Sequence, residues 1–216
     1  MTLAERREIL NAYPDPAPVR RMYRRLRLAR GGYDEIEALV PRDGVVVDLG
    51  CGEGLLAHVL ARRAPGRRVL AVDHDAARVE RVRRSAAGLS IEAVHASMLD
   101  VALPRCDAVL LVDVLHYFDR AAQEALLARA VEALRPGGLL LLREPDAGLY
   151  VRMVWNRFHE RLFTLLRFTR AHIGAYRTAG AWAGLLSHLG CADAAPGRHR
   201  FLSLYADRLV TGHRPS

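Results

Sequence analysis

Apolar and polar positions follow two alternating patterns along most of the chain. Short continuous apolar runs, such as Val45-Val46-Val47 and residues 108–112, are typical of strands buried on both faces. Between them lie stretches such as 55–63, in which apolar residues return every three or four positions, as in helices. This alternation predicts a parallel sheet with helices on both faces. The predicted strands are 45–48, 69–73, 91–95, 107–113 and 139–143. The helices between them are 55–63, 76–87 and 121–134, with Asp119 as the N-cap of the last.

The first forty residues carry helical patterns but no apolar strand run. Helices are expected at 3–12, 19–30 and 35–39, with Asp34 as the N-cap of the third. A proline-rich segment and a glycine pair separate these helices. Because this portion precedes the sheet, residues 1–40 are predicted to form a helical extension, and residues 41–216 the α/β domain.

The C-terminal third begins with an insertion at about 146–176. Its apolar residues, among them Trp155 and Phe158, recur at helical spacing. Three interpretations stay open: a helix packed on the core, a lid over a hydrophobic pocket, and an interfacial helix with arginines beside the apolar face. A last helix is expected from Thr178, its N-cap, to about 189. Two strands, 191–195 and 200–212, then close the chain around a Pro-Gly turn.

The first predicted strand leads into a glycine loop. Asp48 ends the strand, and glycine then occupies every second position, at Gly50, Gly52 and Gly54. Glycine has no Cβ and tolerates positive φ, so a ligand can approach the bare backbone. The N-terminus of the following helix adds partial positive charge. The dinucleotide fingerprint requires a small residue where Leu55 stands, and this disfavours an NAD-linked oxidoreductase.

This loop resembles the first motif of the class I S-adenosylmethionine-dependent methyltransferases. Two further matches flank it: Asp73, which ends the second strand and suits ribose hydroxyls, and the Arg135-Pro136-Gly137-Gly138 turn before the fifth strand. The resemblance covers roughly residues 34–212. It implies an α/β, Rossmann-like, doubly wound seven-stranded sheet with an antiparallel last strand. It also implies S-adenosyl-L-methionine as cofactor, and often an N-terminal extension over the cofactor mouth; a structural cap with solvated arginines is the equal alternative.

Residues at the carboxyl ends of the predicted strands are expected to converge on one ligand site. In the resembling family an acidic residue that bonds adenine commonly stands where this chain has Ser97, and Met98 can lie against the ring. The fourth strand's end, near Val112, lies beside the methionine portion of the cofactor. The expected cofactor-binding set is Asp48, Gly50, Cys51, Gly52, Gly54, Asp73, His74, Ser97, Met98, Val112 and Asp113.

Methyl transfer is an in-line displacement that needs orientation but no covalent protein intermediate. An oxygen acceptor benefits from a general base. His116 is the first candidate, with a structural histidine as the alternative; His159 and Glu144 follow. The histidines show no metal-ligand spacing, so no metal is expected. The predicted function is methyl transfer to a small, hydrophobic or aromatic acceptor, with O-methylation favoured.

Composition and charge limit the classes of binding partner that we expect. The net charge is +8 and the sequence pI about 10.1, yet all 32 basic residues are arginine and lie throughout the chain. This is typical of a GC-rich genome, and no nucleic-acid partner is expected. The fourth strand is followed by Asp113-Val114-Leu115-His116, without the N-P-P-[YF] motif of many base-methylating enzymes. The alternatives are a non-catalytic nucleoside-cofactor-binding protein and, less favoured, an RNA or protein methyltransferase.

The location is expected to be cytoplasmic. Three cysteines without a C-x-x-C pair fit a reducing compartment. No segment approaches about 20 uncharged apolar residues, and the charged N-terminus lacks a signal peptide. An integral membrane segment is therefore not expected, while weak contact with a membrane surface is left open. The sequence does not indicate the oligomeric state.

Overall fold

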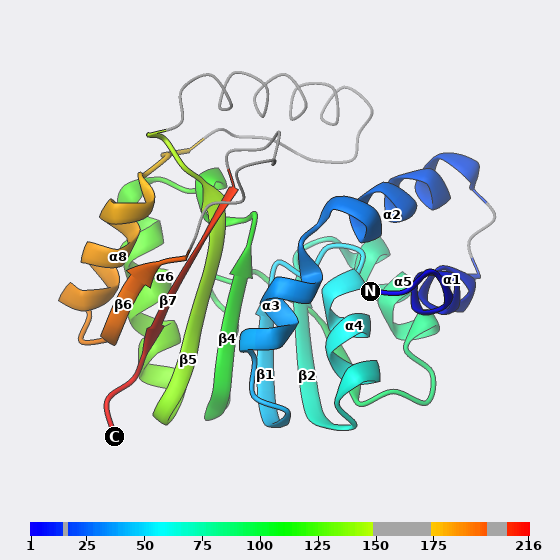
Figure 1. Ribbon diagram of the computed structural model, residues 1–216, viewed down its shortest axis with the longest axis horizontal. Helices are drawn as coiled ribbons and strands as arrows, with labels where there is room; N and C mark the ends of the chain where they lie inside the picture. The colour runs from blue at the N-terminus through cyan, green and yellow to red at the C-terminus, as the bar shows by residue number, and fades with distance from the viewer. Residues whose placement is uncertain (15–16, 149–173, 198–206) are drawn as a thin grey trace. The chain divides into compact units, whose positions relative to one another are not determined.

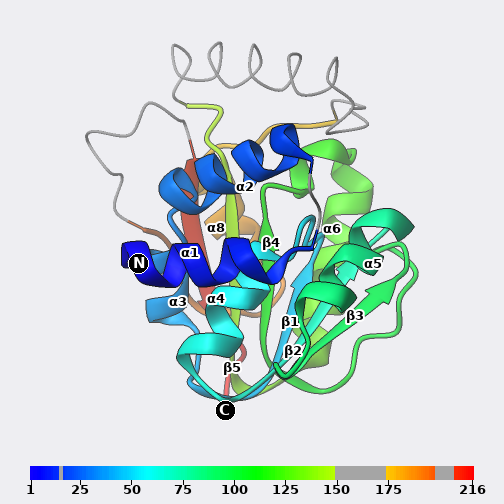
Figure 2. The ribbon, with the colours of Figure 1, turned by 90° about the vertical axis from the view of Figure 1, so that its right-hand side faces the viewer.

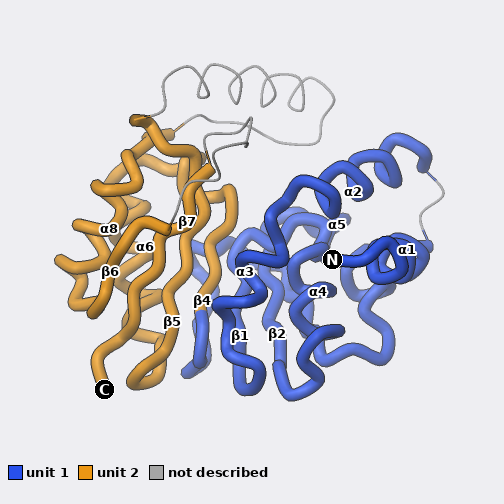
Figure 3. The backbone as a smooth tube through the Cα atoms, viewed as in Figure 1, with its two compact units in different colours: residues 1–108 blue, residues 109–216 orange. Residues whose placement is uncertain are grey.

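The computed structural model describes residues 1–14, 17–148, 174–197 and 207–216. The chain forms two compact units, residues 1–108 and 109–216 (Figure 3). The strand order is β3-β2-β1-β4-β5-β7-β6, and the boundary between the units falls within β4. Within these described ranges, the seven strands and the antiparallel last strand confirm the predicted Rossmann-like α/β fold. The domain bounds 1–40 and 41–216 stay a prediction.

The element bounds agree closely with the sequence periodicity. The first unit contains α1 (Leu3–Ala12), α2 (Pro18–Arg30), α3 (Tyr33–Leu39), β1 (Asp43–Leu49), α4 (Leu55–Arg63), β2 (Gly66–Asp73), α5 (Ala76–Ser85) and β3 (Ile91–His95). The strand β4 (Cys106–Val112) leads into the second unit, which contains η1 (Leu115–Tyr117), α6 (Arg120–Ala133), β5 (Leu134–Pro145), α8 (Ala179–His188), β6 (Ala192–Pro196) and β7 (Asp207–His213).

The first unit is built on three parallel strands. β1 pairs with β2 with Val46 opposite Val69, and β2 pairs with β3 with Ala71 opposite Ala93. These four side chains are buried, as the continuous apolar runs predict. In Figures 1 and 2, α4 and α5 lie against the same strands. The strands therefore deliver the glycine loop and Asp73 to the same end of β1 and β2.

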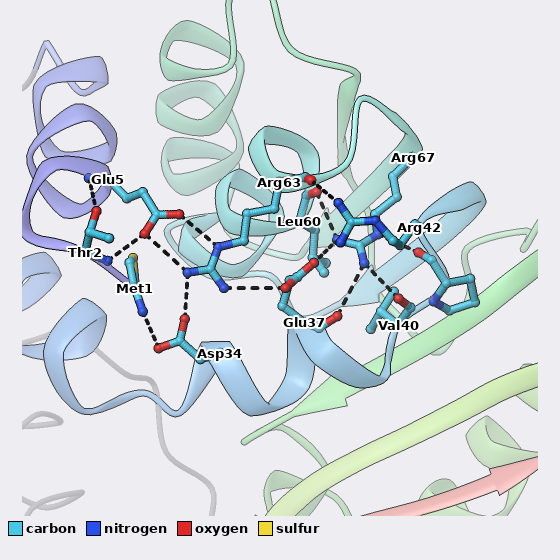
Figure 4. A network of polar contacts seen from close by, with 11 residues as sticks. Met1, Thr2, Glu5, Asp34, Glu37, Val40, Arg42, Leu60, Arg63 and Arg67 are labelled. Atoms are coloured by element: carbon cyan, nitrogen blue, oxygen red, sulfur yellow. Dashed lines mark hydrogen bonds and ion pairs between the residues drawn. The ribbon is translucent and has the colours of Figure 1, made fainter.

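Buried and half-buried arginines help to attach the N-terminal helices, in addition to buried apolar side chains such as Ile9 and Ile36. Arg67 is fully buried, and its guanidinium bonds the Glu37 carboxylate and the backbone carbonyls at the end of α3 (Figure 4). Arg63 binds Glu5 of α1 and Asp34 of α3. Arg67 lies on β2, outside the extension, and this buried cation is stabilised by carboxylate and carbonyl partners.

One local expectation in this region is wrong. Asp34 is not an N-cap: Gly32 is the N-cap of α3, and Asp34 lies in the first turn, where it accepts from the N-terminal amine. In α2, Val19, Met22 and Leu26 are exposed, whereas Arg24 and Leu28 are 1% and 3% exposed. The buried face of this helix therefore combines a charged and an apolar side chain.

The second unit is organised around β5 and β7. These strands are antiparallel with Leu141 opposite Thr211, and β6 pairs antiparallel with β7. In Figure 1, α8 lies beside β6 and β7. The predicted N-caps are confirmed: Asp119 accepts from Ala122 N–H, and Thr178 accepts from Ala181 N–H.

The turn expected at 135–138 is instead the start of β5. The strand begins at Leu134, and Gly137 has a φ of 74°. The Gly137 N–H donates to the carbonyl of Arg214, and the Arg214 N–H donates to the carbonyl of Gly138. Because residue 214 continues the pairing beyond β7, the ladder extends through the Pro-Gly-Gly segment.

Among the described residues, no helix is long and apolar enough to cross a bilayer.

Candidate cofactor and catalytic site

The glycine loop is folded back on the end of β2 by its own backbone. The Gly50 and Cys51 N–H groups both donate to the Val72 carbonyl, at 2.8 and 3.0 Å. The Gly52 N–H donates to Asp73 Oδ2 at 2.8 Å, and the Asp75 N–H donates to Asp73 Oδ1 at 2.9 Å. The structure thus brings the loop and Asp73 together. Each carboxylate oxygen has a second lone pair that a ligand hydroxyl can use.

Gly54 and Gly52 suit their positions in the loop for different structural reasons. Gly54 has a φ of 70°, and a Cβ built on it would lie 2.7 Å from Val82 Cγ2. Close packing of α5 therefore excludes a side chain there. Gly52 has a φ of 56°, and a Cβ there would meet no atom within 4 Å. The backbone at Gly52 borders open space, and this is the room that an approaching ligand needs.

Asp48 and Cys51 lie buried or half-buried beside this loop. Asp48 lies in the buried half of β1, one residue before the end of the strand at Leu49, and is 2% exposed. Burial, followed by the negative charges of Asp48 and Asp73, raises the pKa of the Cys51 thiol well above its usual value. A thiol held protonated is a poor nucleophile, in agreement with the expectation that Cys51 performs no covalent chemistry.

The adenine candidates lie after β3. The Ser97 hydroxyl accepts from the Leu99 N–H at 3.2 Å, and Met98 is buried. The His74 side chain is 60% exposed, with Nδ1 3.6 Å from Asp73 Oδ1. That Ser97, Met98 and His74 contact the cofactor stays a prediction.

Sequence reasoning missed Glu53, which stands between two of the loop glycines. Arg24 of α2 donates to Glu53 Oε2 from Nε at 3.0 Å and from Nη2 at 2.7 Å. Arg81 of α5 donates to Glu53 Oε1 from Nη2 at 2.8 Å. The Tyr13 hydroxyl donates to the Glu53 backbone carbonyl. No local pattern marks these partners, because they come from three separate segments of the chain.

In the second unit, Glu144 near the end of β5 organises the turn after β4. Its Oε1 accepts from the Val114 N–H at 2.8 Å and the Leu115 N–H at 2.7 Å. Its Oε2 lies 3.3 Å from the His116 N–H and 2.6 Å from His116 Nδ1. Glu144 and His116 are 2% and 3% exposed. The structure therefore joins two of the three catalytic candidates directly, whereas His159 lies outside the described residues.

The backbone and ring of His116 have further contacts. Its carbonyl accepts from the Gly174 N–H at 3.0 Å, and its ring is stacked with Tyr176 at a centroid distance of 5.7 Å. The Gln123 side chain, which sequence reasoning missed, donates to the carbonyls of Leu115 and Ala175. These contacts fix the position of the imidazole.

Val112 and Asp113 complete the set of candidate residues. Val112, the last residue of β4, is 9% exposed. Asp113 has a φ of 59°, and its N–H donates to the Arg143 carbonyl at 2.8 Å. Its carboxylate faces Arg143, with Nε 2.9 Å from Oδ1.

Among the described residues, no group of His, Cys, Asp and Glu side chains has the arrangement of a metal site.

Comparison with known proteins finds similarity to methyltransferases and to related enzymes. Residues 46–138 match a family described as a methyltransferase domain. Carboxy-S-adenosyl-L-methionine synthases of Yersinia pestis and Yersinia pseudotuberculosis are 34% identical to this chain over 114 residues. Residues 46–138 thus carry the match to a methyltransferase domain, in agreement with the resemblance on which the sequence prediction rests. The match to the synthases covers 50% of this chain and 43% of their length.

Two solved structures of other proteins are similar to this chain in fold. The pyocyanin biosynthetic protein PhzM is 23% identical, with a TM-score of 0.69 over 94% of this chain and 60% of that chain. An O-methyltransferase family protein from Burkholderia thailandensis is 22% identical, with a TM-score of 0.66 over 89% of this chain and 57% of that chain. At these identities the similarity establishes the fold.

Proposed function

We propose that this protein uses S-adenosyl-L-methionine to methylate a small, hydrophobic or aromatic molecule, with oxygen as the favoured acceptor atom. The observation that carries the proposal is the buried His116–Glu144 pair, with Nδ1 2.6 Å from Oε2. The methyltransferase domain supports the cofactor, and the geometry of this pair supports an acceptor that must lose a proton.

The first unit supplies the residues proposed for the nucleoside part of the cofactor. Open space at Gly52 and the adjoining Asp73 carboxylate fit a nucleoside, whose ribose hydroxyls would donate to Asp73. Ser97 and Met98 are proposed for the adenine end, and Val112 and Asp113 for the methionine end. When bound, the cofactor supplies a methyl group on a positively charged sulfur.

The role of His116 follows from its partner. A carboxylate that accepts backbone N–H groups offers only acceptors, so His116 Nδ1 carries the hydrogen of their shared bond. The lone pair of the neutral ring then lies on Nε2. When an acceptor hydroxyl is methylated, Nε2 would take the proton that this hydroxyl loses. Glu144 orients and stabilises the ring instead of receiving that proton itself.

An aromatic acceptor is supported by a structural neighbour. The O-methyltransferase NcsB1 from neocarzinostatin biosynthesis, solved with S-adenosylmethionine and 2-hydroxy-5-methyl naphthoic acid, is 23% identical with a TM-score of 0.61, over 87% of this chain and 54% of that chain. The molecule bound beside the cofactor in that complex is a small hydroxylated aromatic acid. We propose small-molecule phenols as the first class to screen, and we keep the cytoplasmic location as a prediction.

The first experiment is calorimetric titration with S-adenosylmethionine, S-adenosylhomocysteine and NAD. We expect both sulfur ligands to bind and NAD not to bind; no binding of either sulfur ligand would refute the proposal. Methyl transfer to a panel of phenols then tests the base. His116→Ala should lower turnover by about 100-fold or more while cofactor affinity stays unchanged. The control is His188→Ala, at an exposed position on α8. Cofactor binding without transfer to any acceptor class would favour the non-catalytic alternative.

The named relatives favour a second candidate function. Carboxy-S-adenosyl-L-methionine synthases share 34% identity with this chain over 114 residues. This protein would then form or bind a carboxylated cofactor. Mass spectrometry of the ligand that co-purifies with the protein distinguishes a carboxylated cofactor from S-adenosylmethionine or S-adenosylhomocysteine.

A further inference from the structure

We propose that Arg24 and Arg81, acting through Glu53, are positioning residues that brace the cofactor loop in its binding conformation. The inference rests on the proposed function for the identity of the ligand. It makes residues near the N-terminus, which have no motif of their own, part of the apparatus that determines cofactor affinity.

The loop needs a brace because of its composition. Glu53 stands between Gly52 and Gly54, and both glycines have left-handed φ angles. Glycine has more accessible backbone conformations than any other residue, so a Gly-Glu-Gly segment loses much entropy when it is fixed. Glu53 carries the one long side chain of this segment, and that side chain is directed into the protein, 8% exposed.

Three groups hold Glu53. Arg24 occupies Oε2 through two nitrogens, Arg81 occupies Oε1, and the Tyr13 hydroxyl bonds the backbone carbonyl. The Arg24 guanidinium also lies over the Tyr13 ring, 4.2 Å from its centroid. Both the side chain and the backbone of this loop residue are therefore fixed. Burial opposes ionisation of Glu53, but the bonds from Arg81 and Arg24 outweigh it, and the pKa of the carboxyl is lowered.

Attachment of the N-terminal helices does not require these contacts. α1 is held to α4 by Glu5 and Arg63, and α3 is held by Glu37 and Arg67 (Figure 4). The effect of losing the Arg24–Glu53 bonds should therefore fall mainly on the loop and on α2. This separation makes the brace testable apart from the stability of the unit.

Arg24→Met and Arg25→Met form a matched pair for the test. Both remove one arginine from α2, but Arg25 is exposed whereas Arg24 is buried on Glu53. If the unbraced loop holds its binding conformation about a tenth of the time, the Kd for S-adenosylmethionine rises about tenfold. We expect this rise in Arg24→Met, and no change in Arg25→Met. Arg24→Lys, which keeps the charge but not the fork, should restore part of the affinity.

Hydrogen exchange without any ligand gives an independent measurement. The peptide that contains residues 50–54 should exchange faster in Arg24→Met than in the Arg25→Met control. Equal Kd values in the two variants, or equal exchange of this peptide, would overturn the brace. If Arg24→Met does not fold, Tyr13→Phe, which removes only the hydroxyl on the Glu53 carbonyl, serves in both measurements with the same expected directions. If the unaltered protein binds no S-adenosylmethionine, the proposed function fails, and the exchange result alone decides on the brace.

Discussion

Acid should destabilise this protein through His58, a buried histidine with no proposed catalytic or cofactor-binding role. His58 lies on α4 and is 0% exposed. Its Nε2 is 2.9 Å from Ser85 Oγ, which itself donates to the Val82 carbonyl. Because the single hydroxyl hydrogen is used there, Ser85 accepts from His58 Nε2–H. His58 Nδ1 has no hydrogen-bond partner among the described residues, so protonation would create a buried N–H without an acceptor.

The size of the effect follows from the pKa of His58. Burial, with a smaller contribution from the positive charge of Arg62, lowers that pKa from 6.5 to about 4. Between these values the unfolded chain binds the proton more tightly than the folded protein does. The free energy of unfolding therefore falls as the pH drops from 6.5 toward 4. At 1.36 kcal/mol per unit of pKa difference, the loss approaches about 3 kcal/mol.

Urea unfolding at a series of pH values from about 7 to about 4 measures this loss. The variant His58→Gln retains a donor for Ser85 and does not titrate, so its unfolding free energy should depend less on pH by up to about 3 kcal/mol. His188→Gln, at an exposed position, should follow the unaltered protein. Parallel pH profiles for His58→Gln and the unaltered protein would refute the reasoning.

Two further predictions concern the cofactor loop. Gly54→Ala combines a left-handed φ with a contact 2.7 Å from Val82 and should lower the unfolding free energy by about 3 kcal/mol. Gly88→Ala, with a φ of 77° and open space around the new Cβ, should cost only about 1 kcal/mol, and equal losses in urea unfolding would contradict the packing argument. Asp73→Ala removes the proposed ribose acceptor and the partner of the Gly52 N–H, and should weaken S-adenosylmethionine binding by about 1–3 kcal/mol in calorimetry. Unchanged affinity would exclude Asp73 from the cofactor site.

The sequence alone determined the features that arise from local chemistry. Periodicity located α4 at Leu55–Arg63 and β3 at Ile91–His95, because apolar spacing is imposed within a few turns of the chain. Side chains that can accept a hydrogen bond also marked the N-caps Asp119 and Thr178. The glycine loop and Asp73 carried the resemblance to methyltransferases, since both belong to one strand–loop–helix–strand unit.

Tertiary structure alone decided which charged side chains are buried and which residues they pair with. Arg24 reaches Glu53 across 29 positions of sequence, and His116 reaches Glu144 across 28. No local pattern specifies such pairs, and an arginine-rich helix such as α2 by itself favours arginines in solvent. A buried charge is stable only where a partner of opposite charge or a set of hydrogen-bond partners is already in place. The folded chain supplies those partners, and so the brace on the cofactor loop and the orientation of His116 arise only when separate segments come together.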